Sequence, residues 1–113
     1  MTVQELQDRH CVAIPSGTAP LDADAARGLL ARLAHGWSVD AAGRALERDF
    51  RFEDFHRTMA FVNAVAWIAH REDHHPDLEV GYDRCRVRFS THSVGGLSPN
   101  DFICAARVDA LQR

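Results

Sequence analysis

The sequence has no long hydrophobic run, since no stretch approaches the ~20 apolar residues that a membrane-spanning helix needs. The first eight residues, Met1 to Asp8, lack the apolar core of a secretory signal peptide. The chain also has no excess of positive charge, because its formal net charge is −3 and its pI is about 6.1. This balance argues against nucleic acid or an anionic membrane as a partner. We therefore expect a cytoplasmic protein.

Cysteine is scarce. The three cysteines, Cys11, Cys85 and Cys104, are widely spaced and form no C-x-x-C motif. This pattern argues against a disulfide scaffold and a zinc ribbon, and it favours reduced thiols in the cytosol. With 113 residues and a hydrophobic content of 46%, the chain is long enough to form one domain with its own core.

Residues 1–20 show no sustained periodicity and contain Pro15, Gly17 and Pro20. We expect them to form a weakly structured arm, with at most a helical turn over residues 4–10. His10 and Cys11 are adjacent in this arm, and we interpret them as an incidental surface pair rather than as metal ligands. Residues 21–113 are predicted to form a single domain.

The order of the predicted elements defines the fold class. Helical periodicity predicts helices over about residues 22–35, 53–72 and 98–111. Alternation and turn residues predict strands over residues 37–39, 45–52, 78–82 and 84–90. We therefore predict an α+β fold, a four-stranded antiparallel sheet with three helices packed on one face.

The strongest helical pattern lies between residues 53 and 72. Its apolar residues recur at steps of three or four, and they predict a buried stripe of Phe55, Met59, Val62, Ala66 and Ala69, widened by Phe61, Val65 and Ile68. Trp67 falls outside this stripe, so we expect it either to be partly exposed or to lie at a subunit contact. The helix should end before Pro76, because the residue preceding a proline disfavours the α conformation.

The last strand and the last helix carry clear local signals. Residues 84–90 alternate between apolar and arginine side chains, which predicts a strand with one solvated face. If this strand continues without a bulge, His92 shares the arginine face. Ser98, Pro99 and Asp101 are suited to the N-cap, first and third positions of a helix.

Four of the seven histidines lie between His70 and His92, and two of them, His74 and His75, directly precede Pro76. Imidazole, with an unperturbed pKa of roughly 6.5, serves either proton transfer or metal binding. His70 and His74 are four residues apart, which is half of a zinc signature, and His75 or His92 would have to complete the site. The glutamate and further ligand of that signature are absent, so we expect no metal.

An acid–base site fits the residues better. His74 and His75 would project to different sides of an extended backbone, and His92 would approach from another strand. General acids and bases work best with pKa values near the ambient pH. The alternative is that these histidines are ordinary surface or helix-cap residues. Asp101 has such an alternative too, because a carboxylate at the third helix position satisfies backbone donors and the helix dipole.

The sequence resembles the pterin-4a-carbinolamine dehydratases from Gly36 to Leu111. The family signature is an ionisable residue, His-His-Pro, an aromatic residue, a histidine and an aspartate at set spacings. The matching residues here are His70, His74, His75, Pro76, Tyr82, His92 and Asp101. The flanking segments Ser90-Thr91-His92, Gly96-Leu97-Ser98 and Phe52-Glu53-Asp54-Phe55 are also typical of the family.

The resemblance implies that residues 21–113 form a dehydratase-like domain. The implied activity is the dehydration of a 4a-hydroxytetrahydropterin to quinonoid dihydropterin in tetrahydropterin recycling, with no cofactor and no metal. It implies His74 and His92 as proton-transfer residues, with His75 completing the catalytic set by holding the pterin. It implies substrate-binding roles for the remaining signature residues, namely His70, Pro76, Tyr82 and Asp101. It also implies a homodimer or homotetramer and a functional link to an aromatic amino acid hydroxylase.

Two positions depart from the family pattern. His70 stands where many members have glutamate, and Leu78 stands where animal members have a tryptophan. The alternative function is that of a non-catalytic binding protein, either a Rubisco-assembly factor or a transcriptional coactivator. Assembly factors of this kind have typically lost the histidine signature, whereas this chain retains it, which favours the enzyme.

Overall fold

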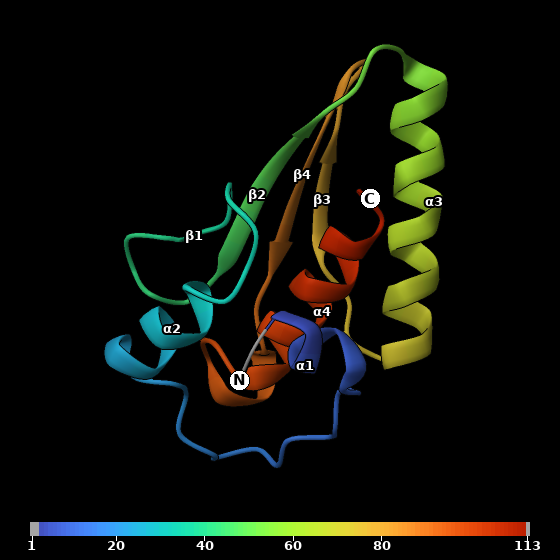
Figure 1. Ribbon diagram of the computed structural model, residues 1–113. Helices are drawn as coiled ribbons and strands as arrows, with labels where there is room; N and C mark the ends of the chain where they lie inside the picture. The colour runs from blue at the N-terminus through green and yellow to red at the C-terminus, as the bar shows by residue number, and fades with distance from the viewer. Residues whose placement is uncertain (1–2, 113) are drawn as a thin grey trace.

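The computed structural model describes residues 3–112 (Figure 1). Its elements are α1 (Val3–Asp8), α2 (Ala23–Leu30), β1 (Ser38–Val39), β2 (Leu46–Arg51), α3 (Phe55–Glu72), β3 (Asp77–Val80), β4 (Arg84–Phe89), the short 3₁₀ helix η1 (His92–Val94) and α4 (Pro99–Ala110). The predicted α+β class, with an antiparallel sheet of four strands and three main helices on one face, is confirmed. Within residues 3–112, none of the helices combines the length and apolar character needed to cross a bilayer.

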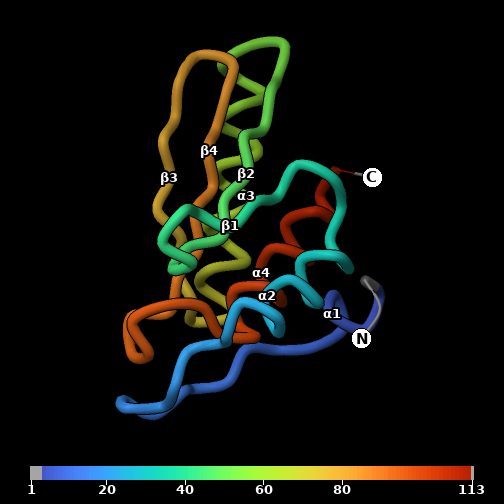
Figure 2. The backbone as a smooth tube through the Cα atoms, turned by 90° about the vertical axis from the view of Figure 1, so that its left-hand side faces the viewer, coloured from blue at the N-terminus to red at the C-terminus, as the bar shows by residue number. Residues whose placement is uncertain are grey.

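The strands are arranged in the order β1-β2-β4-β3, and all neighbours are antiparallel. On the covered face of β4, Cys85, Val87 and Phe89 are buried, as their alternation predicts. Both α3 and α4 contact β4, and the two views show α3 running alongside the sheet (Figures 1 and 2). Strand β3 ends at Val80 instead of residue 82, so Tyr82 lies in the turn before β4.

The buried stripe of α3 differs from the predicted one. It consists of Thr58, Phe61, Val65, Ala69 and Glu72, again at steps of three or four residues. Phe55 and Ala66 were predicted to face inward and are exposed, so that part of the prediction is wrong. The stripe is rotated because Phe61 packs in the core against Phe50, with ring centroids 4.6 Å apart. Trp67 is exposed, as expected.

The carboxylate of Asp109 in α4 connects three parts of the core. It accepts hydrogen bonds from Trp37 Nε1 at 2.8 Å, from Arg48 Nη1 at 2.8 Å and from the Ala34 N–H at 3.3 Å. The prediction that the first helix continues to residue 34 or 35 is wrong, because α2 ends at Leu30. The Ala34 N–H donates a hydrogen bond to this carboxylate, and the residues after α2 form tight turns instead of a helix.

Gly36 makes room for this arrangement. Its φ of +110° is disfavoured for side-chain-bearing residues, and a Cβ at this position would come within 2.8 Å of Arg48 Nε. The glycine therefore lets the chain turn toward Trp37 while Arg48 lies against the backbone.

The N-terminal segment packs against the domain. Leu6 of α1 is fully buried, and α1 contacts α4. Arg107 of α4 donates two hydrogen bonds to the Arg9 carbonyl, from Nη2 at 2.6 Å and from Nε at 3.0 Å. Residues 9–20 contain no helix or strand. The division of the chain at residue 20 stays a prediction.

The Asp109 cluster yields a stability prediction. We expect Asp109→Ala to lower the free energy of unfolding by about 3 kcal/mol, because Arg48 and Trp37 then lose a buried acceptor. Chemical denaturation followed by circular dichroism measures this change. Asp24→Ala is the matched control, since Asp24 pairs with Arg27 on the surface and should change stability little. Equal losses in the two variants would contradict a structural role for the cluster.

Candidate active site

A cavity of about 470 Å³ opens between the end of α3, the end of β4 and the N-terminal segment. His74, His75, Pro76 and His92 all line it, so the fold brings these predicted site residues together. Asp101, another predicted site residue, is fully buried behind His74 at the start of α4. Three histidines of the signature, His74, His75 and His92, thus reach one cavity from separate parts of the chain.

The central contact is a hydrogen bond of 2.6 Å between His74 Nε2 and Asp101 Oδ1. The second carboxylate oxygen, Oδ2, accepts hydrogen bonds from Thr91 Oγ1 at 2.8 Å and from the Ser98 N–H at 2.9 Å. Thr91 and Ser98 are themselves joined through their hydroxyl oxygens at 2.7 Å. Both oxygens of the buried carboxylate are therefore satisfied, and Oδ1 is directed at the imidazole.

This contact fixes the chemistry of the His74 ring. An ionised carboxylate only accepts hydrogen bonds, so the proton of a neutral His74 ring lies on Nε2 while Asp101 is charged. Nδ1 has no hydrogen-bond partner among the described residues and is left as the basic nitrogen. The ring also lies nearly parallel to that of Phe89, with centroids 6.0 Å apart and an angle of 10°.

Two local structures place His74 and Asp101 opposite each other. Helix α3 ends at Glu72, and Asp73 follows with a left-handed φ of 49°, which lets the His74 N–H donate to the Ala69 carbonyl at 3.2 Å. Helix α4 begins with the predicted capping box, in which Ser98 is the N-cap and Asp101 is the third residue. The capping box fixes the position of Asp101, and the left-handed conformation of Asp73 after α3 directs His74 toward it.

His92 and His75 are the exposed members of the group. His92 does not continue the arginine face of β4, because β4 ends at Phe89 and η1 begins at His92. Neither ring makes a hydrogen bond with another described residue, and both line the cavity. Their nitrogens are therefore available to a ligand.

Two predicted substrate-binding residues lie elsewhere. His70 is on the exposed face of α3, with its ring centroid 5.8 Å from that of Trp67. Tyr82 is 66% exposed at the opposite end of α3 and stacks on Phe55, with centroids 6.5 Å apart. Neither residue lines the cavity within one chain, so their role in substrate binding stays a prediction.

Sequence reasoning missed the buried Glu72. Its Oε1 accepts the Cys11 N–H at 2.7 Å, and its Oε2 accepts a hydrogen bond from His10 Nδ1 at 2.9 Å. The interpretation of His10 and Cys11 as an incidental surface pair is therefore wrong. Burial opposes ionisation of Glu72, but these hydrogen bonds more than offset it and lower its pKa. A signal existed, since Glu72 continues the buried stripe three residues after Ala69.

The zinc alternative loses its geometric basis. His70 and His74 do not share a helix face, because α3 ends between them and only His74 turns toward Asp101. In the part of the chain that the structure describes, no three His, Cys, Asp or Glu side chains are grouped so as to hold a metal ion. The arrangement supports acid–base chemistry better than metal binding.

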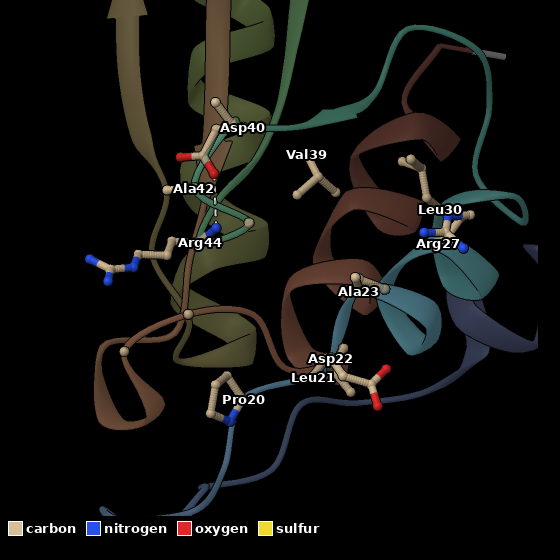
Figure 3. Close-up of a pocket in the computed structure, with 15 residues that line it drawn as sticks. Pro20, Leu21, Asp22, Ala23, Arg27, Leu30, Val39, Asp40, Ala42 and Arg44 are labelled. Carbon is tan, nitrogen blue, oxygen red and sulfur yellow. Dashed lines mark hydrogen bonds between the residues drawn. The ribbon is translucent and has the colours of Figure 1, made fainter.

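A larger cavity of about 680 Å³ lies between α2 and the turn that joins β1 to β2 (Figure 3). No histidine lines it, and its two carboxylates already cap backbone groups. Asp22 accepts the Ala25 N–H at 2.8 Å, and Asp40 accepts the Arg44 N–H at 2.8 Å. The acid–base groups therefore belong to the smaller cavity.

The family model for pterin 4 alpha carbinolamine dehydratase matches residues 19–111. The chain belongs to this family. A relative from Nitrosomonas europaea, named as a pterin-4-alpha-carbinolamine dehydratase, is 53% identical over 109 residues, which are 96% of this chain and 95% of the relative. A relative of the same name from Stenotrophomonas maltophilia is 71% identical over 76 residues, which are 67% and 66% of the two chains.

Two solved structures are similar to this chain. A transcriptional coactivator/pterin dehydratase from Brucella melitensis has a TM-score of 0.77 and 30% identity, and it covers 81% of this chain and 97% of its own. A pterin dehydratase-like protein identified as a RuBisCO assembly factor in the alpha-carboxysome has a TM-score of 0.60 and 26% identity, covering 68% and 89%.

Glu72 gives a prediction about stability and pH. At neutral pH we expect Glu72→Gln to lower the free energy of unfolding by about 1–2 kcal/mol, because the charged hydrogen bonds are lost. A carboxylate with a lowered pKa stabilises the fold above its unfolded pKa of about 4.3, and this stabilisation is lost as the pH falls through the folded pKa.

Urea denaturation at pH 7 and pH 3 measures the effect, and the gap between the two proteins should shrink at pH 3. The control is Glu53→Gln, whose side chain is 84% exposed beside Arg57. A gap that is the same at both pH values would show that the Glu72 charge does not matter.

Proposed function

We propose that the protein dehydrates a 4a-hydroxytetrahydropterin to quinonoid dihydropterin and water. The observation that carries this proposal is the His74–Asp101 pair, joined at 2.6 Å on the wall of a cavity that also exposes His75 and His92. Membership of the family suggests the reaction, and the pair supplies an imidazole prepared for proton transfer. The signature histidines of the family are all present in this chain.

The chemistry calls for one acid and one base. The bond between C4a and the hydroxyl oxygen breaks, and the oxygen takes up a proton and leaves as water. The N5 lone pair forms the new double bond to C4a, and N5 loses its proton. Two protons move and no electrons are exchanged with another molecule. Ionisable side chains are sufficient for such a step, and no redox cofactor is required.

His74 is the proposed base. Its Nδ1 accepts the N5 proton, and the carboxylate of Asp101 stabilises the imidazolium that forms, because the opposite charges are in direct contact. His92 is the proposed acid for the departing hydroxyl. Its ring is exposed on η1, which lines the same cavity as His74, and it makes no hydrogen bond with another described residue. His75 holds the pterin between them.

A second candidate function comes from the similarity to the RuBisCO assembly factor. In that case the protein would act by binding another protein, and the histidine cavity would be dispensable. The retained His74–Asp101 pair favours the enzyme, because a pure binding role gives no reason to direct a buried carboxylate at an imidazole. The catalytic assay below separates the two functions.

The wider setting belongs to the same proposal. We expect a cytoplasmic homodimer or homotetramer that acts beside an aromatic amino acid hydroxylase in tetrahydropterin recycling. Trp67 is 60% exposed on α3, and burial of such a residue between subunits is favourable. Light scattering measures the oligomeric state directly.

Replacing the base should abolish most activity. We expect His74→Ala to lower kcat for carbinolamine dehydration by about 10²–10⁴-fold, the usual contribution of one general base. The control is His56→Ala, since His56 is an exposed histidine in the first turn of α3, away from the cavity. If His74→Ala behaves like the parent, the catalytic proposal is wrong. Activity lost to a chelator, with stoichiometric metal in the protein, would instead support a metal site.

The pH dependence tests the same chemistry. A base must be neutral to accept a proton, so the rate should fall as the pH drops through an apparent pKa between about 5.5 and 7.5. The profile of kcat/KM from pH 5 to 9 measures this limb. A flat profile under conditions where chemistry limits the rate would contradict proton transfer by histidine.

A further inference from the structure

We propose that residues 11–14, here called the wall segment, contact the bound pterin and set its affinity, and that Asn100 positions them. This inference rests on the proposed function. The match to the family model begins at residue 19, so the wall segment lies outside the residues that the model matches.

The wall segment forms one side of the histidine cavity. All four of its residues, Cys11, Val12, Ala13 and Ile14, line the cavity. Three of them are apolar, whereas most of the remaining lining consists of histidine, serine, threonine and acidic side chains. A pterin is a flat ring with polar edges and apolar faces, so its binding requires both kinds of surface. The wall segment supplies apolar surface that the other side of the cavity largely lacks.

Asn100 holds the wall segment by a reciprocal pair of hydrogen bonds. Its Nδ2 donates to the Val12 carbonyl at 2.7 Å, and its Oδ1 accepts the Val12 N–H at 3.1 Å. The neighbouring Cys11 N–H donates to Glu72 at 2.7 Å. A segment without helix or strand is in this way fixed at two consecutive residues. Asn100 also precedes Asp101, so neighbouring residues at the start of α4 position both the wall segment and His74.

Cys11 provides a chemical reporter of the wall segment. Its thiol is partly exposed and lies 3.4 Å from the Cys104 thiol, while Cys85 and Cys104 are fully buried. The hydrogen bond to Cys11, together with burial, raises the pKa of Cys104, which disfavours its reactive thiolate form. A thiol reagent should therefore alkylate Cys11 first. A ligand that contacts the wall segment should shield it.

The first test is protection from alkylation. The wild-type protein is treated with N-ethylmaleimide, with and without a stable 7,8-dihydropterin that cannot be dehydrated, and modification at Cys11 is followed by mass spectrometry. At ten times the Kd of the pterin, only about one-tenth of the protein is free, so alkylation should slow about tenfold. Alkylation at an unchanged rate with the pterin bound would overturn the proposal.

The second test removes the anchor. Asn100→Ala loses both hydrogen bonds to Val12 but keeps the Ser98–Asp101 capping box, so α4 should form. We expect KM to rise about tenfold while kcat stays within about twofold. The reason is that the displaced wall segment loses its contact with the substrate, whereas the groups at the reacting atoms are unchanged. The control is Asn63→Ala, since Asn63 is an exposed asparagine of α3. An unchanged KM in Asn100→Ala would contradict the positioning role.

Ile14→Ala is the second variant, because it leaves the anchor intact and removes only apolar surface from the cavity. It should raise KM by about fivefold or more, in line with the loss of several methyl groups from an apolar contact. An unchanged KM would argue against contact with the pterin.

The two proposals fail in different ways. Protection of Cys11 without any dehydration would refute the proposed function and leave the wall segment as a ligand contact. Dehydration with no protection of Cys11 and an unchanged KM in both variants would refute the wall segment and leave the enzyme.

Discussion

The hydrogen bonds of the Asp101 carboxylate are the constraint on which the site depends. This buried group receives the Ser98 N–H at the start of α4, the Thr91 hydroxyl after β4 and the His74 ring after α3. One side chain thus fixes the relative positions of three elements. A buried carboxylate is tolerated only when its oxygens are satisfied. The positions of Asp101 and of its three partners therefore depend on one another.

The features that the sequence predicts well are local. The alternation around Val87 predicts β4, and the Ser98-Pro99 start predicts α4 with its capping box, because each signal lies within a few residues. The end of α3 near Glu72 is predicted on the same basis. The order of strands β1-β2-β4-β3 is not predicted, since it depends on pairing between segments far apart in the chain.

What the sequence does not predict depends on distance in space. The bonds of Cys11 to Glu72 and of Val12 to Asn100 join residues 61 and 88 positions apart, and no periodicity in the sequence reports such pairs. The family signature has a different limitation. It gives the order of its residues along the chain but not the distances between them in the folded protein. Tyr82 therefore belongs to the signature and yet lies at the far end of α3 from the cavity.

The way in which the wall segment is attached also bears on how a ligand enters. The sheet and helices beside it are held by hydrogen-bonded ladders and a packed core, whereas residues 11–14 are anchored through side chains such as Asn100 and Glu72. Local opening of a protein follows the regions with the fewest cooperative contacts. We therefore expect this side of the cavity to open more readily than the elements that hold His74 and Asp101, so that a ligand could enter without disturbing that pair.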